Sequence, residues 1–418
     1  MRTPGPCGEP RGRSPERTDR GLARILILDG HSAAALAITR SAGRAGHWVA
    51  VGANRGLFAA AKVSRYCRAT LDYPISTAAP EAFVDSVLPF VRGNAIDLVL
   101  PLTDWTLTPL CRHRDRFAGV CKVALPPESA LLAASDKWQT IQLAESLGMA
   151  VPETTLIESA SVPTALHAGA FPVVVKDRFS VRWGAEKTVL GTASYAYSQR
   201  ELEQKVSERL QAAGDVLVQK FVGGPGIGFA CLVNGQNISM PFAWQRIREV
   251  DPRGSASSAR RSIAMDPELL RQSGELLMKI GFQGIAMVEY KKTSTGRLVL
   301  MEINGRAWGS MALPIASGFD FPRYWIQWLL DGAMPPTPSD YKTGITCRRV
   351  VGEMSHLMNV RAGRPAEWPG NYPNFWSTFL RVAVPWYPGV RYDDLWLSDL
   401  KPGLAGIGNW FQMRKKPR

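Results

Sequence analysis

The chain has 418 residues, of which 45% are hydrophobic and 21% are charged, and its formal net charge is +14. This length exceeds what one hydrophobic core supports, so we expect a soluble globular protein of two or three domains. No apolar run approaches the roughly 20 residues that a membrane-spanning helix needs. The six cysteines include no C-x-x-C pair, which argues against a zinc site or a disulfide framework and favours a reduced, cytoplasmic setting.

Positive charge gathers in three places: the first 24 residues, residues 245–261 and the last 18 residues. Nucleic-acid binding is one interpretation of such charge. No recognition helix, zinc finger or RNP-like strand accompanies it, so we expect no nucleic-acid partner. A site for polyanionic small molecules, together with basic tails near a membrane surface, explains the charge at least as well.

Two segments open the chain. Residues 1–21 are rich in Pro, Gly and Arg without an apolar stretch, which predicts a disordered tail and not a secretory signal. Residues 22–130 predict a Rossmann-like domain, because buried strands alternate there with helical segments, as is typical of a parallel, doubly wound sheet. The first turn of this domain lacks a G-x-G-x-x-G fingerprint, so no NAD site is expected.

The next domain is expected over residues 131–335. It opens with a helix, for which Ser135 suits the N-cap and Gly148 the C-terminal end. Strands, a polar loop, a Gly-rich bend and a β-hairpin follow, and a Trp- and Pro-rich extension of poor periodicity ends the chain. The expected ranges are 135–148 for the helix, 171–177 for the first strand, 178–191 for the loop, 215–236 for the strands around the bend, 284–306 for the hairpin and 336–418 for the extension.

The hairpin carries the most informative polar pattern. Alternation places Glu302, Asn304 and Arg306 on one face, directly after apolar residues. A turn centred on residues 294–295 places Glu289 opposite Leu300, so that Glu302 is its diagonal neighbour, at about 7–8 Å between Cβ atoms. Two carboxylates at this separation, with Asn304 as a neutral oxygen donor, suit one or two Mg²⁺ ions. A solvated sheet face is the alternative, and the register decides between the two.

Cations upstream of the hairpin fit a nucleotide. Lys176 follows the apolar run FPVVV, where a charge is costly unless it is paired. Lys137 lies in the first turn of its helix, where the macrodipole disfavours a cation unless an anion is near. Taken singly, each lysine is also explained as a solvent-exposed side chain. The bend GGPG at 223–226 is either a tight turn or a hinge beside an adenine ring.

Residues 131–318 resemble the ATP-grasp superfamily, in particular its carboxylate–amine ligase-like members. The matching stretches occur in the expected order: SDK before a helix, PVVVKD, VQKFVGGPG, MVEY and MEINGRAWGS. The resemblance implies a two-lobed ATP-grasp domain, and the upstream Rossmann-like unit matches the pre-ATP-grasp domain that usually precedes this fold.

The resemblance also implies roles for individual residues. ATP and Mg²⁺ are the implied cofactors, with Mn²⁺ as the alternative metal, and Arg306 would stabilise the anionic intermediate. Gln219 stands where many relatives have an acid, so the adenine contacts are expected to differ from theirs. The implied metal ligands are Glu289, Glu302 and Asn304; the implied phosphate contacts are Lys137 and Lys176, the second also reaching adenine; and the implied hinge contacts to adenine are Gln219, Lys220, Phe221 and Val222.

The predicted activity is an ATP- and Mg²⁺-dependent ligase. It activates a small-molecule carboxylate as an acyl phosphate for attack by an amine, with residues 178–191 as a lid. Arg246, Arg248 and Arg253 either bind the substrate carboxylate or form a solvated basic loop. The alternatives are a carboxylase- or kinase-like use of the same fold and a nucleotide-binding regulatory protein without turnover.

The C-terminal extension interleaves aromatic and basic residues in FWSTFLRVAVPWYPG and NWFQMRKKPR. Such segments occur in peripheral membrane proteins, so we consider membrane contact through the C-terminal tail of a cytoplasmic protein. A packed subdomain that ends in a basic stub is the alternative. The sequence carries no signal for an oligomeric state.

Overall fold

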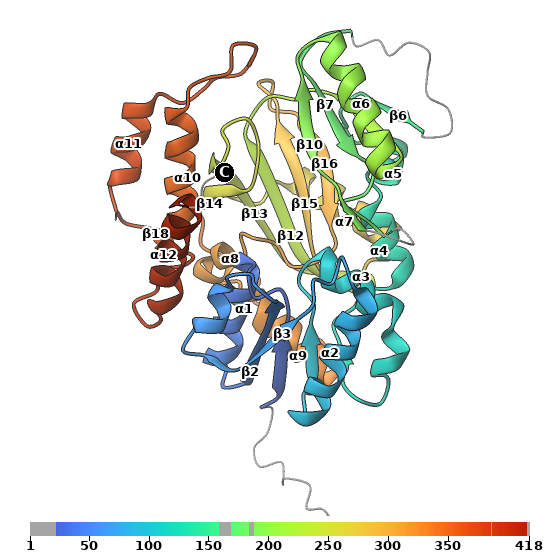
Figure 1. The fold of residues 1–418 in the computed structure, drawn as a ribbon, viewed down its shortest axis with the longest axis vertical. Helices are drawn as coiled ribbons and strands as arrows, with labels where there is room; N and C mark the ends of the chain where they lie inside the picture. Colours follow the sequence, from blue (N-terminus) through green and yellow to red (C-terminus); the bar gives the residue numbers. More distant parts are fainter. Residues whose placement is uncertain (1–21, 159–168, 184–187, 386, 416–418) are drawn as a thin grey trace, which may run out of the picture.

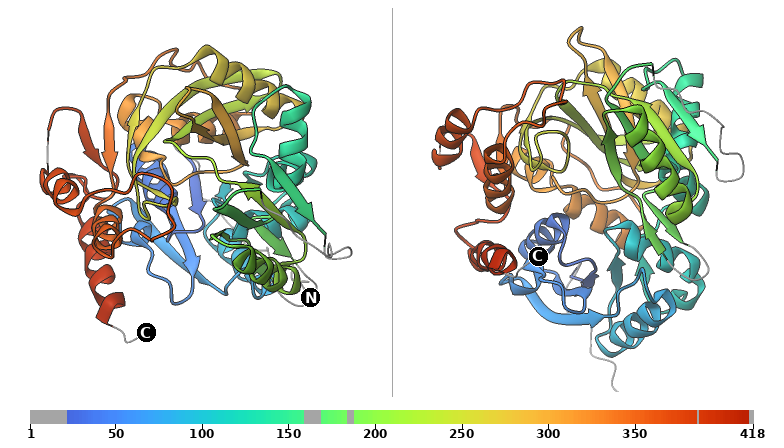
Figure 2. Two further views of the ribbon diagram at one scale, coloured as in Figure 1. Left: turned by 90° about the horizontal axis from the view of Figure 1, so that it is seen from above. Right: turned by 45° about the horizontal axis from the view of Figure 1, so that its top comes forward.

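The computed structural model describes residues 22–158, 169–183, 188–385 and 387–415, so the predicted disordered tail at 1–21 lies outside the described residues. Figure 1 shows an N-terminal domain at the bottom, a large sheet above it, a small lobe at the upper right and C-terminal helices at the left. Both further views in Figure 2 keep the C-terminal helices beside the large sheet, and the right view shows the N-terminal domain below it. Over these ranges, no helix has the length and apolarity that crossing a membrane requires.

The N-terminal domain confirms the Rossmann-like prediction. Its five strands are parallel and follow the order β3-β2-β1-β4-β5, with apolar cores on both faces of the sheet. Its strands are β1 (Arg24–Ile27), β2 (Trp48–Asn54), β3 (Cys67–Tyr73), β4 (Leu98–Leu100) and β5 (Lys122–Val123). Its helices are α1 (Ala33–Arg44), α2 (Pro80–Gly93), α3 (Asp104–Arg112) and α4 (Glu128–Ser135), with 3-10 turns at Ala60–Val63 and Arg114–Phe117.

A buried aspartate fixes the start of helix α3. Asp29 has a φ of 55° and is fully buried at the end of β1. Its carboxylate accepts hydrogen bonds from the backbone N–H of Thr103 at 2.8 Å and from the hydroxyl of Thr106 at 2.6 Å. Burial raises the pKa of Asp29, and the bond from Thr106 opposes that shift. These bonds hold Asp104, the first residue of α3, which takes part in the site described below.

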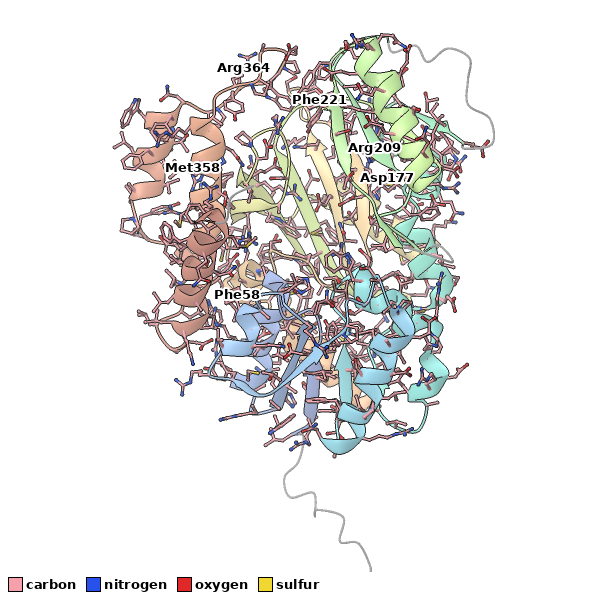
Figure 3. The ribbon with its side chains drawn as sticks, in the orientation of Figure 1. Phe58, Asp177, Arg209, Phe221, Met358 and Arg364 are labelled. Atoms are coloured by element: carbon pink, nitrogen blue, oxygen red, sulfur yellow. The ribbon has the colours of Figure 1, made fainter. Side chains whose placement is uncertain are left out.

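The small lobe is a four-stranded antiparallel sheet in the order β10-β7-β11-β6. Helix α6 packs on this sheet, and Figure 3 shows Arg209 of α6 beside Asp177 of β7, where they form an ion pair at 2.9 Å. The elements are β6 (Thr154–Ile157), β7 (Val173–Asp177), β10 (Ala193–Ala196), α6 (Gln199–Ala213) and β11 (Val216–Lys220).

Two details before and within the small lobe differ from the sequence predictions. Ser135 is not the N-cap: it ends α4, and Asp136 caps α5 (Lys137–Ser146) by accepting from the N–H groups of Trp138 and Gln139. An aspartate caps a helix as well as a serine does, so sequence alone favours neither residue. Part of the predicted loop 178–191 is a two-stranded ladder of β8 (Val181–Trp183) and β9 (Thr188–Leu190), while 184–187 lie outside the described residues.

The large lobe is a seven-stranded sheet in the order β16-β15-β12-β13-β14-β17-β18. One apolar core of this sheet includes residues of α7. A second core includes residues of α8 and α9, and the large sheet shares this core with the N-terminal domain. The strands are β12 (Gly226–Asn234), β13 (Asn237–Glu249), β14 (Ser257–Ser262), β15 (Gly284–Lys292) and β16 (Leu298–Asn304), and the helices are α7 (Pro267–Lys279), α8 (Ala312–Ser317) and α9 (Phe321–Asp331).

The predicted hairpin β15–β16 exists, but its predicted register is wrong. Tyr290 pairs with Leu300, whereas Glu289 pairs directly with Glu302, because the register shifts between these two pairs. Met301 is the extra residue of this β-bulge. The carboxylates therefore share one face, as expected, but they are directly opposite and not diagonal. Directly opposite Cβ atoms lie about 4.5–5.5 Å apart, closer than the diagonal distance.

The C-terminal segment continues the large sheet. Its strands β17 (Thr346–Arg348) and β18 (Val390–Tyr392) extend the sheet beyond β14, and three helices follow the same edge: α10 (Val350–Arg361), α11 (Phe375–Ala383) and α12 (Lys401–Lys415). The predicted domain boundaries stay predictions. The packed-subdomain interpretation nevertheless needs refinement, because the extension shares its sheet with the domain before it.

A buried ion network joins the C-terminal segment to the N-terminal domain. Arg40 of α1 is fully buried and donates to the Asp399 carboxylate at 2.8 Å and to the Asp393 carbonyl at 2.7 Å. The Ser64 hydroxyl also donates to Asp399, at 2.7 Å. The other carboxylate of this group, Asp393, forms an ion pair with buried Arg260 of the large sheet. Three parts of the molecule therefore meet at one set of buried charges.

Candidate active site

A large cavity lies between the two lobes and the C-terminal segment. Its volume is about 1010 Å³, at the upper end of the roughly 300–1,000 Å³ that small-molecule sites occupy. The small lobe contributes Lys176, the bend between β11 and β12 contributes residues 219–226, and β15 and β16 contribute both glutamates. Phe221, labelled near the top of Figure 3, marks where the small lobe meets the cavity.

The paired glutamates form the acidic centre of this cavity. Glu289 accepts from Arg246 at 2.6 Å, and Glu302 accepts from the side-chain amide of Asn304 at 3.1 Å. Burial raises the pKa of Glu289, only partly offset by Arg246. Burial also acts on Glu302, but Lys137 and Lys176 outweigh it and hold the pKa of Glu302 below its usual value. Glu302 is therefore the stronger anionic centre of the pair.

This donor set fits a hard divalent cation. Two carboxylates on one sheet face, with the Asn304 amide oxygen beside them, supply oxygen ligands of the kind that Mg²⁺ prefers, and Mg²⁺ retains positions for phosphate oxygens. Over the described residues, no group of three or more His, Cys, Asp or Glu side chains gathers as a metal site. The pair plus an amide is consistent with this, because it contains only two such side chains.

The two predicted phosphate-binding lysines lie around the same glutamates. Lys176 is 8% exposed, and burial lowers its pKa to about 8. Lys137 donates to the Ser180 hydroxyl at 2.9 Å, and burial also lowers its pKa. The charge of Glu302 opposes the shift of both lysines, which shows that the two ammonium groups and this carboxylate act on one another.

The bend residues expected at adenine lie along the cavity, with different side-chain environments. Gln219 is buried and donates to the Thr154 hydroxyl at 2.9 Å. Lys220 is largely exposed and lies 3.6 Å from the Glu153 carboxylate. The Phe221 ring packs edge-on against Tyr195 and Trp368, and Val222 lines the cavity. The backbone at Lys220 and Val222 thus borders the cavity, while the Lys220 side chain is directed towards Glu153.

Arg306 is held by a residue that the sequence did not reveal. Its Nε donates to Asp104 of the N-terminal domain at 2.8 Å, and Asp104 in turn starts the helix that Asp29 anchors. Burial lowers the pKa of Arg306, but Asp104 outweighs it, so the net pKa is raised and the guanidinium stays charged. The only sequence signal for this partner was the acidic residue Asp104 at the first position of α3. Acids are common at helix starts because they stabilise the helix macrodipole, so this signal does not point to a contact with Arg306.

The three arginines predicted to bind substrate each have an acidic partner. Arg246 lies between Glu289 and Glu249, at 2.6 and 3.1 Å. Arg248 pairs with buried Glu353 at 2.5 Å, and Arg253 pairs with Asp251 at 2.7 Å. All three line the cavity, so the structure brings them to the expected place. Their charges are nevertheless already neutralised by these acids.

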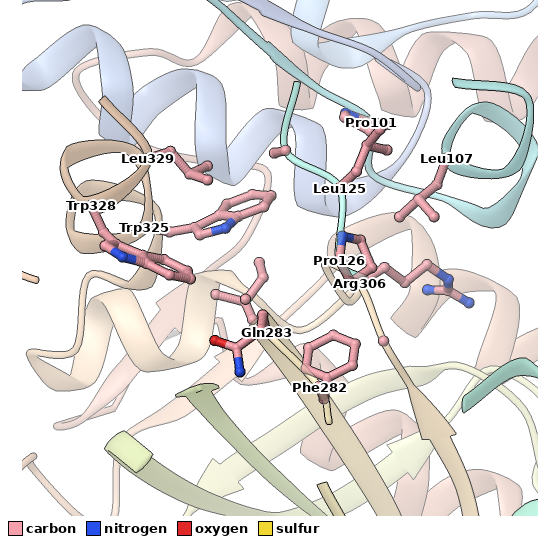
Figure 4. Close-up of a pocket in the computed structure, with 14 residues that line it drawn as sticks. Pro101, Leu107, Leu125, Pro126, Phe282, Gln283, Arg306, Trp325, Trp328 and Leu329 are labelled. Carbon is pink, nitrogen blue, oxygen red and sulfur yellow. The ribbon is translucent and has the colours of Figure 1, made fainter. Parts of the chain in front are cut away.

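A second, small cavity lies behind Arg306, between the N-terminal domain and the large lobe. Its volume is about 50 Å³, and Figure 4 shows the rings of Trp325, Trp328 and Phe282 around it, with the Arg306 guanidinium at one side. This volume accommodates a few water molecules and not a substrate. The large cavity is therefore the candidate active site.

Residues 213–352 match the family model described as "ATP-grasp in the biosynthetic pathway with Ter operon". This chain has an ATP-grasp domain. The match covers the bend, strands β12–β17 and the Glu289–Glu302 pair, so the paired glutamates lie on the sheet of the ATP-grasp domain. The family predicted from the sequence motifs is thereby confirmed.

Parts of this chain are also similar to two known proteins. The chain is 25% identical over 193 residues to tetrahydromethanopterin:alpha-L-glutamate ligase of Methanosarcina acetivorans, covering 44% of this chain and 58% of that protein. It is 25% identical over 199 residues to the vancomycin C-type resistance protein VanC1 of Enterococcus gallinarum, covering 43% and 56%. The chain thus spans less than two thirds of the length of these relatives.

Solved structures show the same ATP-grasp fold over most of the chain. The L-amino acid ligase of Bacillus licheniformis superposes with a TM-score of 0.55 at 17% identity, over 76% of this chain and 78% of that chain. The biotin carboxylase of Campylobacter jejuni superposes with a TM-score of 0.60 at 14% identity, over 78% and 74%. The predicted pairing of a pre-ATP-grasp domain with an ATP-grasp domain is confirmed at the level of fold.

Proposed function

We propose that the protein is an ATP- and Mg²⁺-dependent ligase that joins a small-molecule carboxylate to an amine. The observation that carries the proposal is the direct opposition of Glu289 and Glu302 on one sheet face, in a cavity that Lys176 and Arg306 also line. This set supplies two carboxylates for a metal and cations for a triphosphate. Two proteins to which parts of this chain are similar are named as ligases.

The reaction divides into two balanced steps. A carboxylate oxygen of the first substrate attacks the γ-phosphorus of ATP, the bond to the β-γ bridging oxygen breaks, and ADP leaves an acyl phosphate. The amine nitrogen then attacks the acyl carbon, the bond from that carbon to the phosphate-bearing oxygen breaks, and phosphate leaves while the nitrogen loses a proton. Both steps concentrate negative charge, so positioned cations lower both barriers.

The residues of the cavity have separate duties in this scheme. Glu289, Glu302 and Asn304 hold Mg²⁺, which when bound neutralises phosphate charge. Lys137 and Lys176 bind phosphate oxygens, and the backbone of Lys220 and Val222 borders the adenine. Arg306, braced by Asp104, neutralises the charge that develops on the acyl phosphate and on the intermediate of the second step.

ADP release tests this proposal. The full chain is mixed with Mg²⁺, ATP and pairs of carboxylates and amines, and ADP is measured with a coupled assay. We expect ADP release that needs both substrates and an amide product detectable by mass spectrometry. ADP release that needs only bicarbonate, or only one substrate that becomes phosphorylated, would favour the carboxylase- or kinase-like alternative. Tight ATP binding without turnover over a broad panel would favour the regulatory protein.

The pH dependence of ATP binding follows from Lys176. Its pKa of about 8 means that the ammonium is present below pH 8 and is lost above it. Because only the charged form attracts phosphate, we expect the Kd for ATP to rise roughly tenfold between pH 7 and pH 9. Isothermal titration at several pH values measures this. The Lys176→Met variant should bind ATP weakly with a flatter profile, whereas Lys220→Met, which alters an exposed lysine, should keep the wild-type slope.

We further propose that helix α11 contacts an anionic membrane surface. Figure 1 places α11 at the outer edge of the molecule, and its apolar side chains face solvent: Trp376 is 69% exposed and Leu380 66% exposed. Aromatic and aliphatic side chains on a short helix insert at the headgroup boundary. The net charge of +14 favours anionic lipids over neutral ones.

Vesicle sedimentation tests the membrane contact. Wild-type protein should sediment with vesicles that contain phosphatidylserine and much less with phosphatidylcholine alone. A variant with Trp376→Ser, Phe379→Ser and Leu380→Ser should lose most of this binding, while Leu132→Ser, an exposed apolar residue of α4, should retain it. Equal sedimentation of the triple variant and the wild type would contradict the proposal. A truncation at Pro335 is unsuitable, because it removes β17 and β18 from the sheet.

A further inference from the structure

The wall of the active-site cavity that belongs to the C-terminal segment has its own charge pattern. Arg349, at the start of α10, and Arg381, on α11, both line the cavity on this wall. None of the residues that line this wall is an aspartate or a glutamate. The acids of the cavity, Glu249, Glu289 and Glu302, belong to strands β13, β15 and β16. The acids of the sheet side are paired with basic side chains such as Arg246, whereas the C-terminal wall presents basic side chains and no acid.

The six cavity arginines divide into two groups by their partners. Arg246, Arg248, Arg253 and Arg306 each form an ion pair with an acid, at distances of 2.5–2.8 Å for the closest contact. Neither Arg349 nor Arg381 forms an ion pair with an acid in the parts of the chain that the structure describes. The charge of Arg349 does act on Asp394, but that carboxylate accepts from the N–H of Val350 at 3.1 Å.

Arg349 and Arg381 lie on neighbouring parts of this wall. The preceding residue, Arg348, donates to the carbonyl of Val384 at 2.6 Å and to that of Val382 at 2.7 Å. These two bonds hold the end of α11 against the backbone that carries Arg349. Arg348 is itself buried and paired with Glu353 at 3.1 Å, so the arrangement is rigid at its base. Two guanidinium groups on adjoining elements suit an anion with more than one oxygen.

Two buried nitrogen atoms on the same wall also lack a hydrogen-bond partner within the described ranges: His356 Nε2 and Trp368 Nε1. Their residues are 2% and 4% exposed. The other ring nitrogen of His356, Nδ1, lies 2.6 Å from the Glu249 carbonyl, which accepts only, so Nδ1 carries the proton. Nε2 is then an acceptor in the neutral ring. Unpartnered buried polar atoms beside a cavity are expected where a ligand completes the set.

We propose that Arg349 and Arg381 form a subsite for an anionic group, a carboxylate or a phosphate, on the amine substrate. The inference rests on the proposed ligase function. The reacting carboxylate must lie by the glutamate pair and Arg306, and the amine must reach one face of the planar acyl group, from which phosphate departs after the nitrogen has added. Helices α10 and α11, which carry the two arginines, lie on the opposite side of the molecule from helix α6 of the small lobe (Figure 1), although Trp368 of the same wall contacts Phe221 at the bend. An amine whose acidic group is bound there is oriented with its nitrogen towards the centre.

Binding measurements on the full chain with Mg²⁺ and the non-hydrolysable ATP analogue AMP-PNP test the subsite. The probes are L-amino acids and their primary amides, which differ by one charge, and glycine against aminomethylphosphonate, which separates a carboxylate from a phosphate-like preference. We expect the wild type to bind at least one acid about tenfold or more tightly than its uncharged amide. The Arg349→Gln and Arg381→Gln variants should lose this preference. Arg361→Gln, an exposed arginine at the end of α10, should keep it.

The outcomes separate the subsite from the reaction. If the wild type binds acids and amides equally, or if both variants keep the preference, the subsite is refuted even when ADP release is observed. If the preference depends on Arg349 and Arg381 but no amine supports ADP release, the subsite stands and the ligase activity fails. With turnover, both variants should raise KM for the amine about tenfold or more while KM for ATP and the titrated ATP affinity stay within about twofold of wild type.

Discussion

Replacing Glu302 with glutamine should lower ADP release by about 100-fold or more at saturating ATP. The variant keeps the shape of the side chain but removes the charge that faces Lys137 and Lys176 and that would hold the metal. Losing a single preorganised charge contact at a transition state commonly costs about 10²–10³ in rate. Steady-state ADP release with the best substrate pair from the panel is the measurement.

Two controls make this result specific. Glu268→Gln alters an exposed glutamate on α7, and its rate should match the wild type within about twofold. Asn304→Asp restores one negative charge beside position 302, so in the Glu302→Gln background it should recover part of the activity if charge towards Mg²⁺ is what was lost. A Glu302→Gln enzyme within about tenfold of wild type would remove the glutamate pair from the proposed mechanism.

Arg40→Met should destabilise the fold by about 3–5 kcal/mol, because it leaves the carboxylate of Asp399 buried without its guanidinium partner. For a protein of 418 residues, whose unfolding entropy scales with its length, we expect the midpoint of thermal unfolding to fall by about 3–6 °C. Differential scanning fluorimetry measures the midpoint.

The matched control is Arg116→Met, which breaks an exposed ion pair with Asp85 of nearly the same length, 2.7 Å. Exposed pairs contribute about 0–1 kcal/mol, so this midpoint should move by about 1 °C at most. A double variant, Arg40→Met with Asp399→Leu, should regain part of the lost stability because no charge is then left unpaired. Equal shifts for Arg40→Met and Arg116→Met would show that the buried network does not hold the parts together.

The sequence predicted the identity of the central side chains, but not how they are paired. Alternation along β16 correctly placed Glu302, Asn304 and Arg306 at the site, because strand periodicity is local. The bulge at Met301 was not predictable from alternation, since a bulge changes the partner across the sheet without changing the residue pattern. As a result, the predicted diagonal pair is in fact directly opposed.

The sequence also did not predict the ion pairs between residues that lie far apart along the chain. The basic segment 245–261 has two acidic partners within itself, Glu249 and Asp251. Its other two partners, Glu289 and Glu353, lie 43 residues from Arg246 and 105 residues from Arg248, and only the fold brings these pairs together. The same holds for Asp104, which reaches Arg306 across 202 positions. Local pattern thus predicted which residues surround the cavity, while the neutralisation of their charges depended on tertiary contacts.

The C-terminal extension was the least predictable part. Its strands β17 and β18 have three residues each, too short for a periodic signal, and their place in the large sheet depends on pairing with β14. Its aromatic and basic residues left membrane contact and a packed subdomain as alternatives, and neither of them predicted a contribution to the cavity. In the structure, Trp368 packs against Phe221 at the bend, and Arg349 and Arg381 line the cavity.

The bond between Arg306 and Asp104 crosses from the large lobe to the N-terminal domain, and it limits how this architecture can be recombined. Grafting the small and large lobes onto a foreign N-terminal domain would preserve the paired glutamates, because both belong to the large sheet. Arg306 would lose its ion pair with Asp104 unless the new domain carried an acid at the beginning of the equivalent helix. Ancestral exchange of these halves would therefore have required both positions to change together.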